Sequence, residues 1–264
     1  MDTSDTDTFS YEPSSLPYLF GWYFWILFIL TFISPRVISP WLGRTLIPES
    51  YAKLGKYLSL VNTLFMSTLH AVVVSLTTLY ILATVCMENR VFSKCWLGFA
   101  TMQLSLGYFV GDFINCLVDA ELRKDKANLA HHVVGMIGLY LGLYHQGKFM
   151  FFIVYRFVAE CSTPFVNMFW LLRLMKKQQS KLFVVNSVLM VTVFFACRIA
   201  PIPWHWYKFF WTQMDPAVVL LPWYLRLWTL ATYVVFDTLN LLWFRKMLNG
   251  CIKFFLKSDK SVVE

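Results

Sequence analysis

The chain has 264 residues and a formal net charge of +8, and 58% of its residues are hydrophobic while only 14% are charged. A soluble domain is usually about 45–50% apolar and about 25% charged, so this composition excludes an ordinary soluble protein and indicates a chain that crosses a membrane several times. The basic residues form no stripe interleaved with aromatics. We therefore expect no nucleic-acid partner and assign the positive charge to cytoplasmic loops, where Lys and Arg collect.

An acidic, polar segment opens the chain at residues 1–16. It lacks the positively charged start of a signal peptide, so we expect a disordered tail. The hydrocarbon core of a bilayer needs about 20 predominantly apolar residues of helix, and seven later stretches meet or nearly meet that length. These seven expected spans are Tyr18–Ser34, Tyr57–Val85, Trp96–Val118, Leu129–His145, Phe149–Met175, Lys181–Ala200 and Val218–Leu248.

Basic residues give the expected orientation of the spans. Sixteen Lys and Arg side chains fall in segments on one side, and four fall on the other. Because Lys and Arg favour cytoplasmic loops, we expect a lumenal N-terminus and a cytoplasmic C-terminus. The chain then divides into a first helix with its loop at residues 17–56, a six-span domain at residues 57–248, and a basic cytoplasmic tail at residues 249–264.

An aromatic segment, Trp204–Trp211, lies between prolines that separate the sixth and seventh spans. Trp and Tyr favour the headgroup level, so we expect an interfacial helix or loop there. His145 and His205 fall at the ends of spans, and we expect both to be solvated.

Nine ionisable residues fall inside the expected spans. Such residues are costly in a bilayer and usually face the interior of the helix bundle or a water-filled cavity. One interpretation is internal ion pairing that only holds helices together. The other is a functional cavity that opens to the cytoplasm, which the number of these groups favours. The nine residues are His70, Asp112, His131, His132, Arg156, Glu160, Arg198, Arg226 and Asp237.

The fifth span carries polar residues at helical spacing. Arg156, Glu160, Thr163 and Asn167 follow one another at intervals of four, three and four, which places them on one face of an α-helix. Arg156 and Glu160 can then pair along the helix. Pro164 has no N–H, so the carbonyl of Glu160 is expected to be a free acceptor beside a kink.

Two adjacent histidines, His131 and His132, begin the fourth span. Adjacent side chains on a helix point about 100° apart, so we expect one ring to enter the cavity and the other to bond a neighbouring helix. A neutral imidazole can act as a general base or as a nucleophile, with Asp112 or Asp237 orienting it. The spacing of HExxH zinc sites is absent, so we expect no metal.

Several motifs in order resemble the TLC-domain family of multi-span proteins, which includes the ceramide synthases. Similarity is greatest to its branch of TLC domain-containing proteins four and five. The resemblance spans about Tyr57 to Leu248. It rests on Ser67-Thr-Leu-His70, Gly107-Tyr-Phe-Val-Gly-Asp112, His131-His132, Arg156-Phe-Val-Ala-Glu-Cys-Ser-Thr-Pro-Phe-Val-Asn167 and Phe236-Asp-Thr-Leu-Asn240.

The resemblance implies an all-α membrane protein in which one helix precedes six that curve around a central, lipid-sized cavity. It also implies residence in the endoplasmic reticulum or another endomembrane, a lipid or fatty acyl partner, and a role in lipid metabolism. Acyl-CoA would be a co-substrate, with no other cofactor. The expected catalytic residues are His131, His132, Asp112, Glu160 and Asp237, and the expected substrate-binding residues are His70, Arg156, Thr163, Asn167, Asn240 and Arg198.

One departure from the ceramide synthases leaves catalysis undecided. Those enzymes follow the histidine pair with a motif close to HDxxD, whereas the corresponding region here reads Tyr155-Arg-Phe-Val-Ala-Glu160. The first hypothesis is still an enzyme, an acyl-CoA-dependent acyltransferase that resembles sphingolipid N-acyltransferases. The alternative is a non-catalytic lipid-binding protein or regulator of membrane composition. A proton-coupled transporter ranks third, because the charge layout indicates closure on one side.

Overall fold

The structure is a computed structural model, and it describes residues 20–38, 40–41, 57–84 and 94–260. The expected disordered tail at residues 1–16 lies outside the described residues, as does most of the loop that precedes the second expected span. Within the described ranges every regular element is a helix, as the composition predicts.

Within residues 94–260 the helices follow one another with short connections. Three helices of the fold continue directly into a turn of different pitch: α2 passes into the π-helical turn η1, α8 passes into the 3₁₀ helix η4 and then α9, and α10 passes into the π-helical turn η5. The elements are α2 (Trp22–Ile33), η1 (Ser34–Ile38), α5 (Leu58–Thr84), α6 (Trp96–Val118), η3 (Leu122–Lys124), α7 (Lys126–Tyr144), α8 (Met150–Arg156), η4 (Phe157–Ser162), α9 (Thr163–Leu174), α10 (Lys181–Phe194), η5 (Phe195–Ile199), α11 (Ile202–Gln213), α12 (Pro216–Val219) and α13 (Trp223–Lys260).

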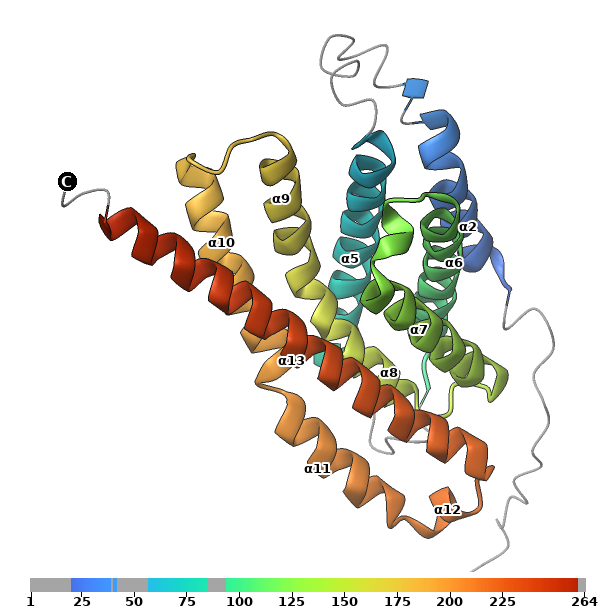
Figure 1. Cartoon of the computed structure of the whole chain (residues 1–264). Helices are drawn as coiled ribbons and strands as arrows, with labels where there is room; N and C mark the ends of the chain where they lie inside the picture. The colour runs from blue at the N-terminus through green and yellow to red at the C-terminus, as the bar shows by residue number, and fades with distance from the viewer. Residues whose placement is uncertain (1–19, 39, 42–56, 85–93, 261–264) are drawn as a thin grey trace, which may run out of the picture.

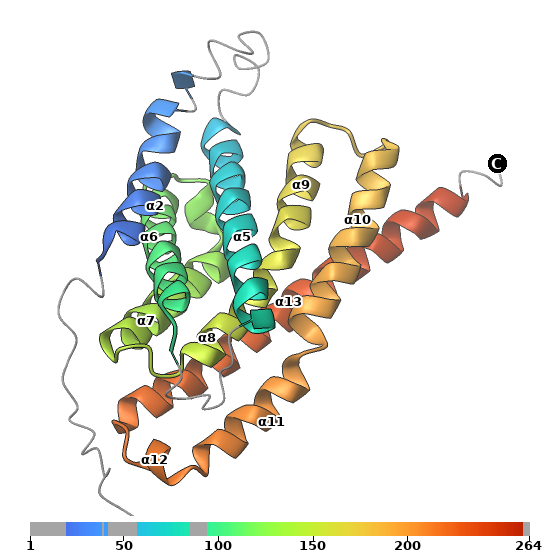
Figure 2. The same cartoon turned by 180° about the vertical axis from the view of Figure 1, so that it is seen from behind.

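The helix ends gather at two ends of the molecule. The end of η1, the start of α5, the α9–α10 connection and the last turns of α13 lie at the top of Figure 1, while α11, α12 and the α7–α8 turn lie at the bottom. The long α13 runs diagonally between the two ends in both views (Figures 1 and 2). The α9–α10 connection, which contains Lys176 and Lys177, therefore lies at the same end as the last turns of α13 (Figure 1).

Helix α6 is the centre of the first half of the fold, where it packs against α2, α5 and α7. Small and polar residues dominate its buried positions, including Gly98, Ser105, Gly107 and Gly111. Small side chains let neighbouring helices approach closely, as in other membrane helix pairs. The same composition lowers the hydropathy of α6, so its sequence looks less like a lipid-facing span.

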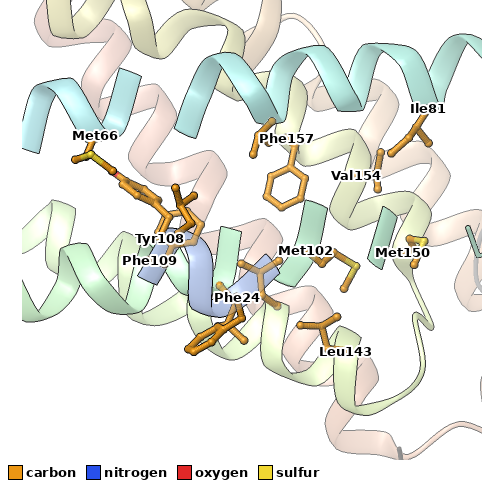
Figure 3. Packing of buried hydrophobic residues seen from close by; sticks show 14 residues of the cluster. Phe24, Met66, Ile81, Met102, Tyr108, Phe109, Leu143, Met150, Val154 and Phe157 are labelled. Atoms are coloured by element: carbon orange, nitrogen blue, oxygen red, sulfur yellow. The ribbon is translucent and has the colours of Figure 1, made fainter. Parts of the chain in front are cut away.

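A buried apolar cluster joins α2, α5, α6, α7 and α8 to η4 (Figure 3). Large side chains from all six elements interdigitate there, so the elements around α6 are held to one another by a shared core. The labelled members are Phe24, Met66, Ile81, Met102, Tyr108, Phe109, Leu143, Met150, Val154 and Phe157.

Among the described residues, three helices are long and apolar enough to cross a membrane, namely Leu60–Thr84, Lys181–Gln213 and Trp223–Lys253. A shorter apolar helix occupies Trp22–Val37. These helices agree with a membrane protein. The full set of seven spans stays a prediction, because the other helices fall short in length or hydropathy.

The helix of the seventh expected span begins later than predicted. Val218 belongs to the short helix α12, and α13 starts at Trp223, directly after Pro222. Proline cannot donate a helical hydrogen bond and disfavours the helical conformation of the residue before it, so the apolar run is broken there. At its other end α13 continues through residues 249–260.

Gly107 is where α2 and α6 approach most closely. A Cβ atom at this position would lie 2.2 Å from the carbonyl oxygen of Phe24 and 3.1 Å from the amide nitrogen of Phe28. Both are backbone atoms, so α2 would have to move. We expect Gly107→Ala to lower the free energy of unfolding in detergent by about 1–3 kcal/mol.

Gly250→Ala is the matched control for this prediction. Gly250 also lies in a helix, but a Cβ there would meet nothing within 4 Å. Replacing an exposed helical glycine with alanine usually stabilises by roughly 0.5–1 kcal/mol. An equal loss in both variants would contradict the close approach of α2 and α6.

Candidate functional site

The fifth expected span is bent rather than continuous, because η4 separates α8 from α9. Pro164 cannot supply the α-helical hydrogen bond to the carbonyl of Glu160. The backbone N–H of Thr163 donates to that carbonyl instead, in the tighter pattern of a 3₁₀ helix. The prediction of a free carbonyl acceptor is therefore wrong. Because the helix changes pitch at η4, the side chains before and after it do not share one face as they would in a continuous α-helix.

The bend also changes the partner of Arg156. A 3₁₀ helix has three residues per turn, so a spacing of four does not align Arg156 with Glu160, and the predicted pair is wrong. Both terminal nitrogens of Arg156 instead bond the carboxylate of Asp237 on α13. Trp206 Nε1 donates to the same carboxylate over 2.9 Å, and the Arg156 guanidinium lies 4.2 Å from the centre of the Tyr233 ring.

Arg198, in η5, ties three other elements together. Its Nε donates to the Ser162 hydroxyl over 2.9 Å and to a carbonyl of η4 over 3.1 Å. Its terminal nitrogens donate to Thr163 Oγ1 over 3.0 Å and to Asn240 Oδ1 over 3.3 Å. The Thr163 hydroxyl donates in turn to Glu160 over 2.8 Å. Arg198 also lies 3.9 Å from the second Glu160 oxygen, so this buried acid and base balance one another.

His132 is bonded at both ring nitrogens. Its Nδ1 lies 2.8 Å from the carbonyl oxygen of Asn128, and its Nε2 lies 2.9 Å from Oδ2 of Asp112 on α6. A carbonyl can only accept, so Nδ1 carries a proton and the second proton lies between Nε2 and the carboxylate. Of the two acids considered from the sequence, Asp112 is the one that contacts the histidine pair. His132 thus has no free nitrogen for a ligand.

This contact predicts a difference between two substitutions of Asp112. Asparagine can donate its side-chain N–H to a neutral His132 Nε2, so Asp112→Asn keeps a hydrogen bond. Alanine leaves a buried nitrogen without a partner, which costs about 1–3 kcal/mol. We therefore expect Asp112→Ala, but not Asp112→Asn, to lower the unfolding midpoint of the detergent-solubilised protein clearly. Equal losses would contradict the assignment.

His131 faces the other way from His132, as the offset between adjacent helical residues predicts. Its ring packs against the rings of Phe109, Phe236 and Trp243, with centroids 5.8, 5.0 and 5.7 Å away. In the part of the chain that the structure describes, neither of its ring nitrogens has a hydrogen-bond partner. His131 is therefore the member of the pair that can reach a ligand.

A pocket opens beside His131, between α7, α8, η4, η5, α11 and α13. Its volume is about 110 Å³, somewhat below the ~150 Å³ of an engineered cavity that holds benzene. It has room for a head group or a short length of chain, and the lipid-sized cavity stays a prediction. Five expected site residues line the pocket, namely His131, Arg156, Glu160, Arg198 and Asn240.

Two expected substrate-binding residues bond between helices instead. His70 Nε2 lies 3.1 Å from the Ser105 hydroxyl, and its ring stacks on Tyr108 at 4.1 Å. Asn167 donates to the carbonyl of Leu64 and to the Thr68 hydroxyl. Neither side chain is among those that line the pocket. The other expected site residues, Asp112, His132, Thr163 and Asp237, do not line the pocket either. Thr163 and Asp237 bond the pocket-lining residues Arg198 and Arg156.

The expectation that His145 and His205 are solvated is wrong. They are only 1% and 5% exposed. The α7–α8 turn and α11 fold against the start of α13, where His145 Nε2 lies 3.3 Å from the Tyr224 hydroxyl. His205 lines the pocket, as does Tyr233. Sequence reasoning missed both, because they sit in an aromatic segment and an apolar run that carry no motif.

Comparisons with known proteins place the chain in a family. A model described as the TLC domain matches residues 60–249. TLC domain-containing protein 4-B of Danio rerio is 29% identical over 73% of this chain and 74% of its own length. TLC domain-containing protein 4 of Homo sapiens is 29% identical with the same coverage.

Topoisomerase I damage affected protein 4 of Saccharomyces cerevisiae matches more of the chain, with 26% identity over 93% of this chain and 90% of its own length. No solved structure matches the chain. The TLC-domain model covers well over half of the residues, including the histidine pair and every expected site residue. The chain therefore belongs to the TLC-domain family.

Proposed function

We propose that the chain is a multi-pass endomembrane protein of lipid metabolism or homeostasis, and that its pocket binds a lipid or a fatty acyl chain. The observation that carries the proposal is the unpaired ring of His131 in a largely apolar pocket wall. The two arginines that line the pocket are already balanced, since Asp237 neutralises Arg156 and Glu160 neutralises Arg198, and Lys148 is a further basic residue of the pocket wall. Such a pocket suits an apolar ligand with a small polar group. Membership of the TLC-domain family supports a lipid-related process.

The proposed membrane placement has seven spans, with the N-terminus in the lumen of the endoplasmic reticulum and the C-terminus in the cytoplasm. It is supported by the sixteen-to-four distribution of Lys and Arg over the expected loops. The α9–α10 connection, which contains Lys176 and Lys177, also lies at the same end as the last turns of α13 (Figure 1). Protease protection of sealed microsomes tests it. A tag placed after Glu264 should be cleaved without detergent, and a protected tag would reverse the orientation.

The proposed chemistry is acyl transfer with His131 as general base. His131 would take a proton from the amine or hydroxyl of an acceptor, whose nitrogen or oxygen then attacks the thioester carbonyl of acyl-CoA. The carbon–sulfur bond breaks, and the leaving thiolate takes the proton back from His131, so that free CoA and the acylated acceptor result. His132 would position its neighbour through the bond to Asp112.

The test is acyl transfer by the purified protein from acyl-CoA to a panel of amine and lysolipid acceptors. Loss of a general base usually lowers the rate by about 10²–10⁴-fold, and we expect that loss in His131→Ala. His145→Ala is a control at a buried histidine outside the pocket wall. Transfer that His131→Ala leaves unchanged would remove the catalytic role.

The alternative is a non-catalytic lipid-binding protein that senses or adjusts membrane composition. The closed hydrogen-bond set of His132 favours it, because one histidine of the pair is held as a structural link between α6 and α7. Retention of a lipid without acyl transfer to any acceptor in the panel would identify this function.

A further inference from the structure

One region of the pocket carries polar atoms that the protein itself does not satisfy. In the described part of the chain, Arg156 Nε, both ring nitrogens of His205 and the Tyr233 hydroxyl are buried without a hydrogen-bond partner. The three side chains come from α8, α11 and α13, and all three line the pocket beside η4.

Their burial makes these unsatisfied atoms informative. His205 is 5% exposed and Tyr233 is 2% exposed. Most buried polar groups in folded proteins are hydrogen-bonded, so each exception calls for an explanation such as a ligand. Because these atoms belong to side chains that line a pocket, a group bound in the pocket can satisfy them.

The three side chains form one cluster around the Tyr233 ring. The guanidinium carbon of Arg156 lies 4.2 Å from the centre of that ring. The His205 ring lies 6.2 Å from it, at a steep angle. A single small group in the pocket can therefore contact all three side chains.

The charges of the cluster define the kind of group that fits. Asp237 already neutralises Arg156. The ring neighbours of His205 are the aromatic side chains of Tyr155, Trp204 and Tyr233. A second positive charge beside Arg156 would be disfavoured both by burial and by repulsion, so His205 is neutral.

The hydrogen-bonding capacity follows from that state. A neutral imidazole has one donor and one acceptor, a tyrosine hydroxyl can do both, and the guanidinium Nε only donates. The cluster thus offers more donors than acceptors and no net charge. A carbonyl oxygen together with a hydroxyl group satisfies it, whereas a phosphate would find no unbalanced cation within the cluster; Lys148, a further basic residue that lines the pocket, is not part of it.

We propose that Arg156, His205 and Tyr233 form a subsite for the uncharged head group of a lipid that combines a carbonyl with a hydroxyl. The inference rests on the proposed function, since it takes the pocket to be a lipid site and adds the class of head group. The first carbons of the acyl chain would then lie beside Gly135 and Gly138 of α7, and the rest of the chain would extend out of the pocket.

Binding of three oleoyl-sized probes to the full-length protein in detergent, measured by native mass spectrometry, tests the proposal. Monooleoylglycerol has the carbonyl and hydroxyl groups, oleoyl lysophosphatidic acid adds a phosphate, and 1-octadecene has no head group. We expect monooleoylglycerol to bind at least tenfold more tightly than the other two. Tighter binding of the phosphate-bearing lipid would overturn the choice of an uncharged group.

Two variants assign the effect to the cluster. Tyr233→Phe removes only a hydroxyl that bonds none of the residues that the structure describes, and His205→Phe keeps a ring in the same packing. Each should therefore fold and weaken monooleoylglycerol binding by about three- to tenfold, as expected for one lost hydrogen bond, without weakening octadecene binding. Tyr207→Phe, at a tyrosine that is 58% exposed on the same helix as His205, should bind like the wild type.

The outcomes separate this inference from the function on which it rests. If the wild type binds neither monooleoylglycerol nor octadecene, the lipid pocket itself is wrong. If the wild type binds monooleoylglycerol and both phenylalanine variants bind it equally well, the pocket stands and the subsite is overturned, with only water on these polar atoms.

Discussion

Asp237→Ala is expected to lower the free energy of unfolding by about 3–5 kcal/mol, the usual cost of removing one partner of a buried ion pair. Asp237 receives both terminal nitrogens of Arg156 as well as the indole N–H of Trp206. Its loss leaves a guanidinium, only 16% exposed at the side chain, without a counter-charge. Unfolding of the detergent-solubilised protein in denaturant measures the change.

A double variant and a surface pair complete this test. Arg156→Met combined with Asp237→Leu removes both charges, and we expect most of the lost stability to return, because apolar replacements of buried pairs are often neutral. The Lys124–Glu121 pair is 69% and 77% exposed, so Glu121→Gln should change stability by less than about 1 kcal/mol. Equal effects of Asp237→Ala and Glu121→Gln would show that the buried pair does not form.

Arg198→Met is expected to be as damaging as Asp237→Ala, at about 3–5 kcal/mol, because it also strips a buried charge of its partner. Arg198 holds Ser162, Thr163 and Asn240 in place from η5. Its loss leaves Glu160, 13% exposed at the side chain, with the Thr163 hydroxyl as its remaining partner. Lysine should not rescue this position, since an ammonium cannot reproduce the guanidinium fork.

Two further variants separate charge balance from general damage. Adding Glu160→Gln to Arg198→Met removes the uncompensated charge, and glutamine can still accept from Thr163, so part of the lost stability should return. Arg173→Met is the matched control at an exposed arginine of α9, where we expect a change within about 0.5 kcal/mol. A double variant no more stable than Arg198→Met would contradict the pairing of Glu160 with Arg198.

The features that follow local helical geometry could be predicted from the sequence. The helical class follows from the apolar stretches. The different directions of His131, which lines the pocket, and His132, which bonds Asp112, follow from the 100° offset of neighbouring residues. The list of buried polar residues also included both members of the Arg156–Asp237 pair. Each of these inferences needs only composition or residues close together in the chain.

The errors arose where distant segments decide the structure. Arg156 and Asp237 are 81 positions apart, and spacing along one helix favoured Glu160 instead. The 3₁₀ geometry of η4 depends on how Pro164 is accommodated. His205 was assigned to solvent because it follows a span, but α11 folds back against α13 and buries it. In each case a tertiary contact determined where the side chain lies, and no local sequence pattern indicates that contact.

The central claim, that the pocket holds a lipid, is tested most directly by native mass spectrometry of the protein purified from membranes in mild detergent. A Cβ atom at Gly138 would already lie 3.5 Å from Thr232 and 3.6 Å from Trp228, so the outer carbons of a leucine there would occupy pocket space. We expect a retained lipid on the wild type and on the control Gly250→Leu, and much less on Gly138→Leu. A folded wild type without lipid, or Gly138→Leu with as much lipid as the control, would contradict the claim.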